Sequence, residues 1–199
     1  MKPIHDGNRR GFVTGLITTG VAGLTLPLLN SNAIPQADLS PTRACDDDDE
    51  PTLEQTEGPY FTPNSPERAT LREAGMAGIP ITLTGFVLTR SCHPIVGALV
   101  ELWHADDAGE YDNVGYRLRG HQFTGADGRY AFDTIVPGIY PGRARHFHLK
   151  FQAPDQPVLT TQFYFPGEPG NERDNIFDPT LLLQIEGDVA RYDTVLDPA

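Results

Sequence analysis

The chain has 199 residues and a formal net charge of −12 at pH 7, with 15 lysines and arginines against 27 aspartates and glutamates. So acidic a surface repels the phosphate backbone, which argues against a nucleic-acid-binding protein. The length is sufficient for one domain with its own hydrophobic core.

Residues 1–37 have the features of an export signal. A basic start containing Arg9 and Arg10 precedes an apolar run over residues 11–29, and small residues follow at 31–33. The stretch around the arginine pair resembles a bacterial twin-arginine signal. An uncleaved membrane anchor is the alternative, but the glycines, threonines and proline in the run count against a span. We therefore expect an exported protein, periplasmic or extracellular, without a stable membrane span once the signal is removed.

Residues 38–77 are interpreted as an extended N-terminal arm lying on the domain that follows. The acidic run Asp46–Glu50 is typical of a solvated, flexible lead-in. Helical character is found only over residues 66–76, with a proline at the expected first turn. Cys45 and Cys92 could form one disulfide in an oxidising compartment, tying the arm to the domain; two thiols that never meet are the alternative.

Residues 78–199 carry short apolar runs, and the chain's 20 glycines and 18 prolines punctuate such runs throughout. The runs alternate or are rich in β-branched and aromatic residues, which indicates strands. Several short strands with almost no helix predict an all-β sandwich or barrel. Strands are expected at residues 79–89, 95–103, 129–135, 146–153 and 158–165, with shorter ones at 181–186 and 191–196.

Four side chains at the expected strand ends form a candidate metal site. His146 and His148 share one face of a strand, because successive side chains point to opposite faces. Tyr111 and Tyr140 each follow a strand end, where a rigid sheet positions accessible side chains. A phenol ligates well only where a strong Lewis acid takes its proton, and Fe(III) prefers such oxygen ligands. Taken singly, each residue also has a plainer interpretation as packed or solvated surface.

Short motifs follow one another in order over residues 53–166. They are Gln55–Tyr60, Glu101–Leu102, Gly109–Tyr111, Arg119–Thr124, Asp127–Phe132, Pro137–Tyr140 and Arg143–His148, with Gly85 preceding the second. Their ordered combination resembles the intradiol ring-cleavage dioxygenase family, of the protocatechuate 3,4-dioxygenase-like, exported single-domain type. The resemblance implies a β-sandwich. We therefore expect an all-β sandwich of short antiparallel strands with an extended N-terminal arm.

The resemblance also implies a non-haem Fe(III) cofactor held by Tyr111, Tyr140, His146 and His148. In that family a catechol-type substrate displaces the tyrosine that matches Tyr140, and the freed phenolate takes a substrate proton. The ring then opens with O2 between its two hydroxylated carbons, giving a cis,cis-muconate-type product.

Three further positions match functional residues of the family. Arg143 matches the arginine that stabilises negative charge on the ring, and Gln162 matches the glutamine that orients it. Tyr60 matches a position that lines the substrate pocket. The resemblance therefore implies that Tyr140, Arg143 and Gln162 are catalytic, and that Tyr60 and Arg143 bind substrate.

Two departures from the family pattern bear on substrate choice: the link from Tyr140 to His146 is short, and Arg145 stands where a small residue is usual. Catechol, protocatechuate, hydroxyquinol and lignin-derived catechols all stay open as substrates. The oligomeric state is open too, a homo-oligomer being one option.

Two other functions also compete. One is a Zn(II) hydrolase that uses the histidine pair, with His104 and Asp106 as further ligands. The other is a non-catalytic exported sandwich that binds a partner, with the tyrosines as contact residues.

Overall fold

The computed structural model describes residues 50–197 of the protein. The predicted export signal and Cys45 lie outside the described residues. Cys92 is disulfide-bonded. Across residues 50–197, no helix is long and apolar enough to cross a lipid bilayer.

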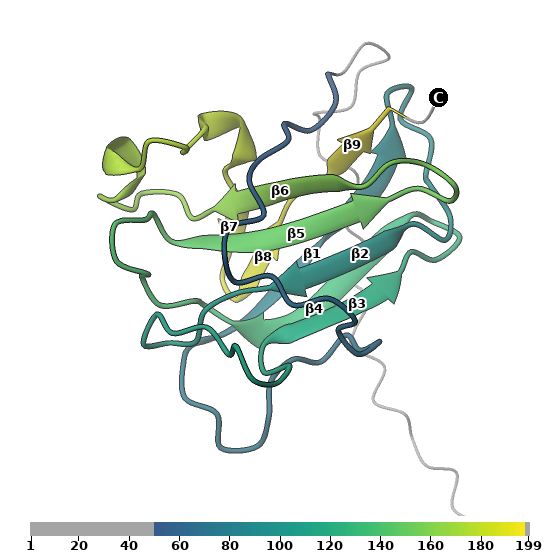
Figure 1. Cartoon of the computed structure of the whole chain (residues 1–199). Coiled ribbons are helices and arrows are strands. Elements are labelled where there is room, and N and C mark those ends of the chain that lie inside the picture. The colour runs from purple at the N-terminus through teal and green to yellow at the C-terminus, as the bar shows by residue number, and fades with distance from the viewer. Residues whose placement is uncertain (1–49, 198–199) are drawn as a thin grey trace, which may run out of the picture. The chain divides into compact units, whose positions relative to one another are not determined.

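Two packed sheets form a β-sandwich, which confirms the predicted fold class (Figure 1). One sheet has the strand order β4-β1-β8-β7, with β9 also paired to β1, and the other has the order β3-β2-β5-β6. The first sheet contains β1 (Pro80–Thr89), β4 (Arg129–Ile135), β7 (Gln184–Glu186), β8 (Val189–Arg191) and β9 (Thr194–Leu196). The second contains β2 (Leu99–Trp103), β3 (Arg119–Phe123), β5 (His146–Gln152) and β6 (Leu159–Tyr164). Two 3-10 turns, η1 (Asn171–Arg173) and η2 (Pro179–Leu181), follow β6. Neighbouring strands run antiparallel except that β1 pairs in parallel with β8 and with β9.

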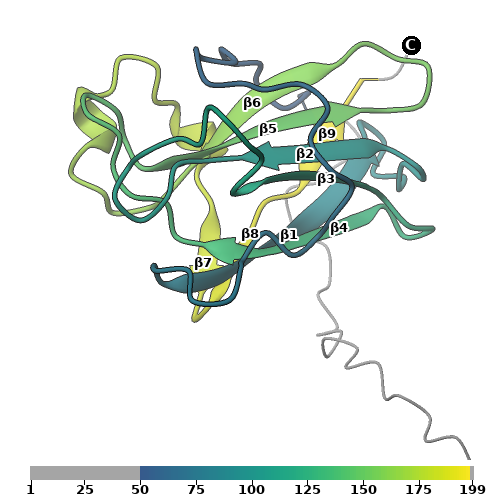
Figure 2. The same ribbon diagram turned by 60° about the horizontal axis from the view of Figure 1, so that its bottom comes forward.

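The core lies between the two layers seen in Figure 2. In β5, Phe147, Leu149 and Phe151 point into it and are fully buried, as are Phe132 of β4 and Phe163 of β6. Full burial of each phenylalanine contributes about 1.5–3 kcal/mol. This packing fixes the register of β5, and alternation then places His146 and His148 on the outer face of the sheet.

Residues 50–79 run outside the strands and are tied to both sheets by backbone hydrogen bonds. The Gln55 N–H donates to the Thr160 carbonyl of β6 at 2.8 Å, and the Leu71 N–H donates to the Asp133 carbonyl of β4 at 2.8 Å. As the chain crosses the outer face of β5 and β6, it covers side chains that would otherwise face solvent.

The helical character predicted over residues 66–76 is wrong. This stretch is extended and forms parallel bridges, with Glu67 beside His121 and Thr70 beside Asp133. Its Leu71 side chain is completely buried in the core. Tertiary packing and pairing with strand backbones therefore override the local helical preference.

Some strands differ from those expected. β3 was missed, because its sequence Arg-Gly-His-Gln-Phe has neither apolar alternation nor a β-branched residue. The strand expected at 95–103 begins only at Leu99, after a turn. The strand expected at 191–196 is shorter, β9 from Thr194 to Leu196. A separate strand, β8, ends at Arg191 and pairs with a different part of β1.

Candidate metal centre

A row of buried side chains crosses the outer face of the β3-β2-β5-β6 sheet. Trp103 is paired in register with Arg119 on one side and with His148 on the other, and His148 is paired with Gln162. Cross-strand partners project to the same face, so these four side chains are neighbours. Each is at most 3 % exposed. Near its first residues β5 is thus buried on both faces.

The two histidines present nitrogens to each other, with 3.0 Å between their Nε2 atoms. Nδ1 of His146 lies 2.6 Å from the Ala144 carbonyl oxygen. Since a carbonyl only accepts, Nδ1 carries the proton and Nε2 keeps its lone pair. Burial lowers the pKa of His146 to about 4 and that of His148 well below its usual range. Both imidazoles are therefore neutral near pH 7, the form that binds metals.

The ring of His148 is held by stacking. It lies parallel to the indole of Trp103, with 5.0 Å between ring centroids and 11° between planes. Nδ1 of His148 is buried and has no hydrogen-bond partner within residues 50–197. On the other side the backbone closes in, because a Cβ on Gly58 would lie 3.3 Å from Cε1 of His148.

Tyr111 places its hydroxyl beside the histidine pair, with Oη 3.3 Å from Nε2 of His146. Its ring stacks on Tyr60, with centroids 4.7 Å apart. Burial raises the pKa of Tyr111 above its ordinary value, although the charges of Arg143 and Arg119 act in the opposite direction. The phenol is therefore protonated unless a cation displaces its proton.

Tyr140 is brought to the same cluster by its loop. Its Oη lies 2.7 Å from Oη of Tyr60, and its ring meets the edge of Tyr111 with 6.0 Å between centroids. The two tyrosine loops touch backbone to backbone: the Gly138 N–H donates to the Asp106 carbonyl at 2.7 Å. A Cβ on Gly138 would lie 2.3 Å from the Gly109 nitrogen. Only glycine permits this approach.

The predicted ligand set is therefore gathered in one place, and its chemistry fits a ferric ion. Two neutral imidazoles and two phenols supply nitrogen and oxygen donors from β5 and from the loops before it. No group of three or more histidine, cysteine, aspartate or glutamate side chains among the described residues could hold a metal.

Arg143 lies beside the ligands and is held on two sides. Its Nη2 donates to Oε1 of Gln162 at 2.6 Å, and its Nε donates to Oδ2 of Asp174 at 2.8 Å. The Gln162 amide is oriented in turn, because its Nε2 donates to the Thr56 carbonyl at 2.9 Å. Sequence reasoning placed Arg143 with Gln162 but missed Asp174, which sits in a loop after η1 with no local pattern to mark it.

The residues that would support a zinc hydrolase are used elsewhere. His104 engages both ring nitrogens, with the Ala105 carbonyl at 2.7 Å and the Thr134 hydroxyl at 2.6 Å. The Asp106 carboxylate accepts from the Ala108 and Glu110 N–H groups and from Arg117. Neither side chain joins the histidine pair.

Arg145 is likewise engaged by partners other than the proposed ligand side chains. Its Nε donates to Glu168 at 2.8 Å, and its Nη1 donates to the Pro137 carbonyl.

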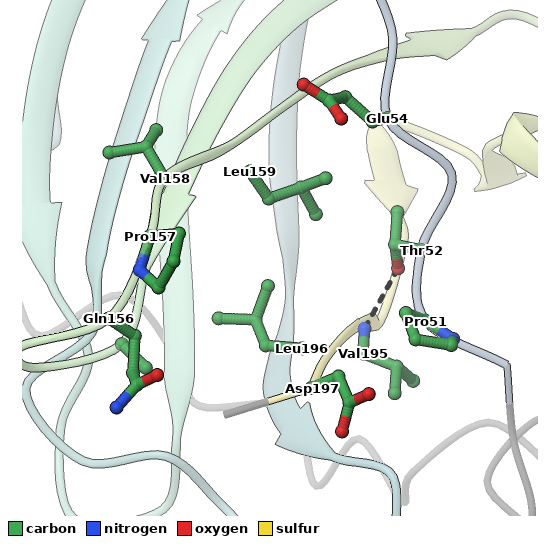
Figure 3. Close-up of a pocket in the computed structure, with 11 residues that line it drawn as sticks. Pro51, Thr52, Glu54, Gln156, Pro157, Val158, Leu159, Val195, Leu196 and Asp197 are labelled. Atoms are coloured by element: carbon green, nitrogen blue, oxygen red, sulfur yellow. Dashed lines mark hydrogen bonds between the residues drawn. The ribbon is translucent and has the colours of Figure 1, made fainter. Parts of the chain in front are cut away.

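A pocket at the other end of β5 and β6 is separate from this cluster (Figure 3). It lies between the Ala153–Leu159 turn, the start of the described chain and β9. There the Val195 N–H donates to the Thr52 hydroxyl at 2.9 Å. None of the predicted site residues lines it.

Comparison with known proteins gives one consistent result. A family model described as "Dioxygenase" matches residues 56–197. Hydroxyquinol 1,2-dioxygenase of Nocardioides simplex is 32 % identical over 144 residues, covering 60 % of this chain and 49 % of the relative. The beta chain of protocatechuate 3,4-dioxygenase of Burkholderia cepacia is 36 % identical over 121 residues, covering 52 % of each. The chain belongs to the intradiol ring-cleavage dioxygenase family. This confirms the family predicted from the motifs.

Among solved structures, the dioxygenase domain of a dioxygenase–carbohydrate-binding protein fusion from Streptomyces sp. SirexAA-E is similar over its whole length. The TM-score is 0.72 at 52 % identity, with 75 % of this chain and 100 % of that one covered. The chain spans about half the length of the curated intradiol dioxygenases it matches. The family membership thus concerns the sandwich that carries the tyrosine and histidine cluster.

Proposed function

We propose that this intradiol dioxygenase is a non-haem Fe(III) enzyme that opens a catechol-type ring with O2, between the two hydroxylated carbons, to a cis,cis-muconate-type product. The convergence of Tyr111, Tyr140, His146 and His148 carries the proposal, with the Nε2 atoms of the histidines 3.0 Å apart. Bound by these side chains, Fe(III) would supply a Lewis acid that ionises phenols and makes a catecholate reactive toward O2.

Tyr140 would hold and move a proton in this reaction. Its Oη shares a 2.7 Å hydrogen bond with Oη of Tyr60. This hydrogen bond is the main cause that raises the pKa of Tyr60, so Tyr60 stays a phenol and can donate to an ionised Tyr140. A Tyr140 phenolate supported in this way is a base for a substrate hydroxyl.

Arg143 supplies fixed positive charge where negative charge builds on the ring. The guanidinium is only 20 % exposed at its side chain and is oriented by Gln162 and Asp174 before any substrate arrives. Such a preorganised cation costs no reorganisation at the moment of reaction. The segment of residues 55–60 excludes water from the same face, with Tyr60 stacked on Tyr111 and Gly58 packed over His148.

Oxygen uptake with a panel of catechols tests this function. Iron-loaded protein is incubated with catechol, protocatechuate and hydroxyquinol, and the products are identified by mass spectrometry. We expect consumption of one O2 per ring and a muconate-type diacid from at least one substrate. A semialdehyde product, which places the cut outside the diol, would contradict the proposal, as would an iron-loaded protein that consumes no O2 with any of them.

We also propose export of the protein, from the arginine pair and apolar run in residues 1–37. Replacing Arg9 and Arg10 by lysine is expected to retain the protein inside bacterial cells, as measured by fractionation. An exported double variant would contradict a twin-arginine route.

A further inference from the structure

Asp174 makes two contacts with a single carboxylate oxygen. Its Oδ2 accepts from Nε of Arg143 at 2.8 Å and from the backbone N–H of Ala144 at 2.9 Å. The other oxygen, Oδ1, accepts from the Ile176 N–H at 3.2 Å. The Asp174 side chain is 3 % exposed, so these donors replace water. Burial of a carboxylate costs free energy unless hydrogen bonds of this kind compensate for the lost water.

The two contacts lead to different parts of the site. Arg143 is the cation that faces the reacting ring in the proposed function. Ala144 is one step from a ligand, because its carbonyl accepts the Nδ1 proton of His146 at 2.6 Å. Oδ2 of Asp174 therefore orients Arg143 directly and, through the Ala144 peptide, supports the tautomer of His146.

Charge supports the same arrangement. Burial favours the neutral acid, but the N–H groups of Ala144 and Ile176, together with the Arg143 guanidinium, hold the pKa of Asp174 below its usual value. A carboxylate that is ionised and sequestered near pH 7 orients a guanidinium more firmly than the neutral Gln162 amide does.

We propose that Asp174 is a positioning residue that holds Arg143 by its side chain and His146 through the Ala144 backbone, an inference that rests on the proposed function. Loss of Asp174 then has two separable consequences. Turnover falls because Arg143 loses its orientation, and metal release quickens because the peptide that orients His146 loses its anchor.

A second arginine–carboxylate pair in the same stretch provides the matched control. Nε of Arg145 lies 2.8 Å from Oε1 of Glu168, with side chains 22 % and 23 % exposed. This pair has the same chemistry and similar sequence spacing, but neither member contacts a proposed ligand side chain or Gln162 in the hydrogen bonds described. Glu168→Gln is therefore expected to leave turnover and iron release within about twofold, because both members of the pair are partly exposed and no proposed ligand side chain loses a contact.

The test is a double-mutant cycle on the full iron-loaded chain. Asp174→Ala is expected to lower kcat about 10- to 100-fold with little change in KM, since a charge-assisted hydrogen bond near the reacting ring is lost. In an Arg143→Ala background the same change is expected to lower kcat less than about threefold, because its target is already absent. Asp174→Asn, which keeps the shape, gives the same comparison if Asp174→Ala does not fold.

Iron release to an excess of chelator gives the second readout, independent of turnover. Asp174→Ala is expected to release iron several-fold faster than wild type in both backgrounds, whereas Arg143→Ala alone is expected to release it at the wild-type rate. Additive losses of kcat would overturn the link to Arg143, and unchanged iron release would overturn the link to His146. A wild-type protein that binds iron but cleaves no catechol overturns the proposed function instead, and leaves the iron-release comparison readable.

Discussion

The two ends of the β5–β6 strand pair have very different surroundings. At the first residues of β5 the outer face of the sheet is covered, and His146, His148 and Gln162 are buried there. At the other end lies the pocket of Figure 3, lined chiefly by proline and aliphatic side chains with the carboxylates of Glu54 and Asp197. The pocket offers space but no histidine, tyrosine or arginine. The comparison teaches that the proposed metal site is marked by converging buried donor atoms and not by a pocket.

The segment of residues 55–60 accounts for this difference in burial between the two ends of β5. β5 is buried on both faces from His146 to Leu149, whereas Lys150 and Gln152 on its outer face are partly exposed. Residues 55–60 cross the strand at its buried part, where the Gln162 amide donates to the Thr56 carbonyl. The segment that excludes water from the site therefore also contains Tyr60.

The sharpest way to break the comparison is to remove one donor from the first end. His148→Ala is expected to abolish both iron retention and ring cleavage, because it removes an imidazole donor that is held in place by stacking on Trp103. Iron per chain and O2 uptake measure this. The control is Val158→Ser in the pocket, expected to leave both within about twofold. Equal losses at the two ends would show that neither end is special.

Removing charge without removing a ligand should give the next largest effect. Arg143→Ala is expected to lower kcat about 10²- to 10³-fold while iron content stays at the wild-type level, because a preorganised cation is lost from the reacting ring. Steady-state kinetics with matched metal analysis measure both quantities. Unchanged turnover would show that Arg143 stabilises no charge in the reaction.

The contact between the two tyrosine loops sharpens the comparison further. Gly138→Ala is expected to destabilise the fold by about 1–3 kcal/mol, because its Cβ would fall on the backbone of Gly109. It is also expected to weaken iron binding by separating Tyr140 from Tyr111. Gly125→Ala serves as the control, since its Cβ would meet only the Asp127 side chain at 3.4 Å. Urea unfolding and iron titration report the two effects, and equal results for both variants would contradict this account.

The last effect is confined to acid pH and concerns the buried histidine outside the cluster, His104. Burial lowers the pKa of His104 to about 4, against a usual value near 6.5. Between pH 6.5 and pH 4 the unfolded chain takes up a proton that the folded chain refuses, so stability is expected to fall as pH falls, by at most about 1.4 kcal/mol per pH unit for this group. His104→Gln should flatten the acid limb of the unfolding curve measured on metal-free protein. An unchanged slope would contradict the assignment.

Much of this architecture was predictable from sequence because β5 alternates so clearly. Phe147, Leu149 and Phe151 mark the core face, which assigns His146 and His148 to the other face. Family motifs then predicted the tyrosines and Arg143. The structure brings these residues together, and their roles stay predictions until iron binding and turnover are measured.

What sequence could not predict depends on contacts between distant segments. The stretch at residues 66–76 is extended only because β3 and β4 supply backbone partners. β3 is a strand because β2 pairs with it, although its own residues give no signal. Asp174 reaches Arg143 across 31 positions of chain, from a loop without periodicity. Such features become visible only once the sheets are assembled.

The visible spectrum of the iron-loaded protein tests the central claim most directly. A phenolate bound to Fe(III) absorbs visible light by charge transfer, so the wild-type protein is expected to be red-brown. Tyr111→Phe and Tyr140→Phe should each weaken or shift that band, whereas Tyr116→Phe, whose hydroxyl bonds to the Pro63 carbonyl at 3.1 Å, should not. A colourless protein with bound iron, or a band unchanged in both ligand variants, would contradict coordination by these tyrosines.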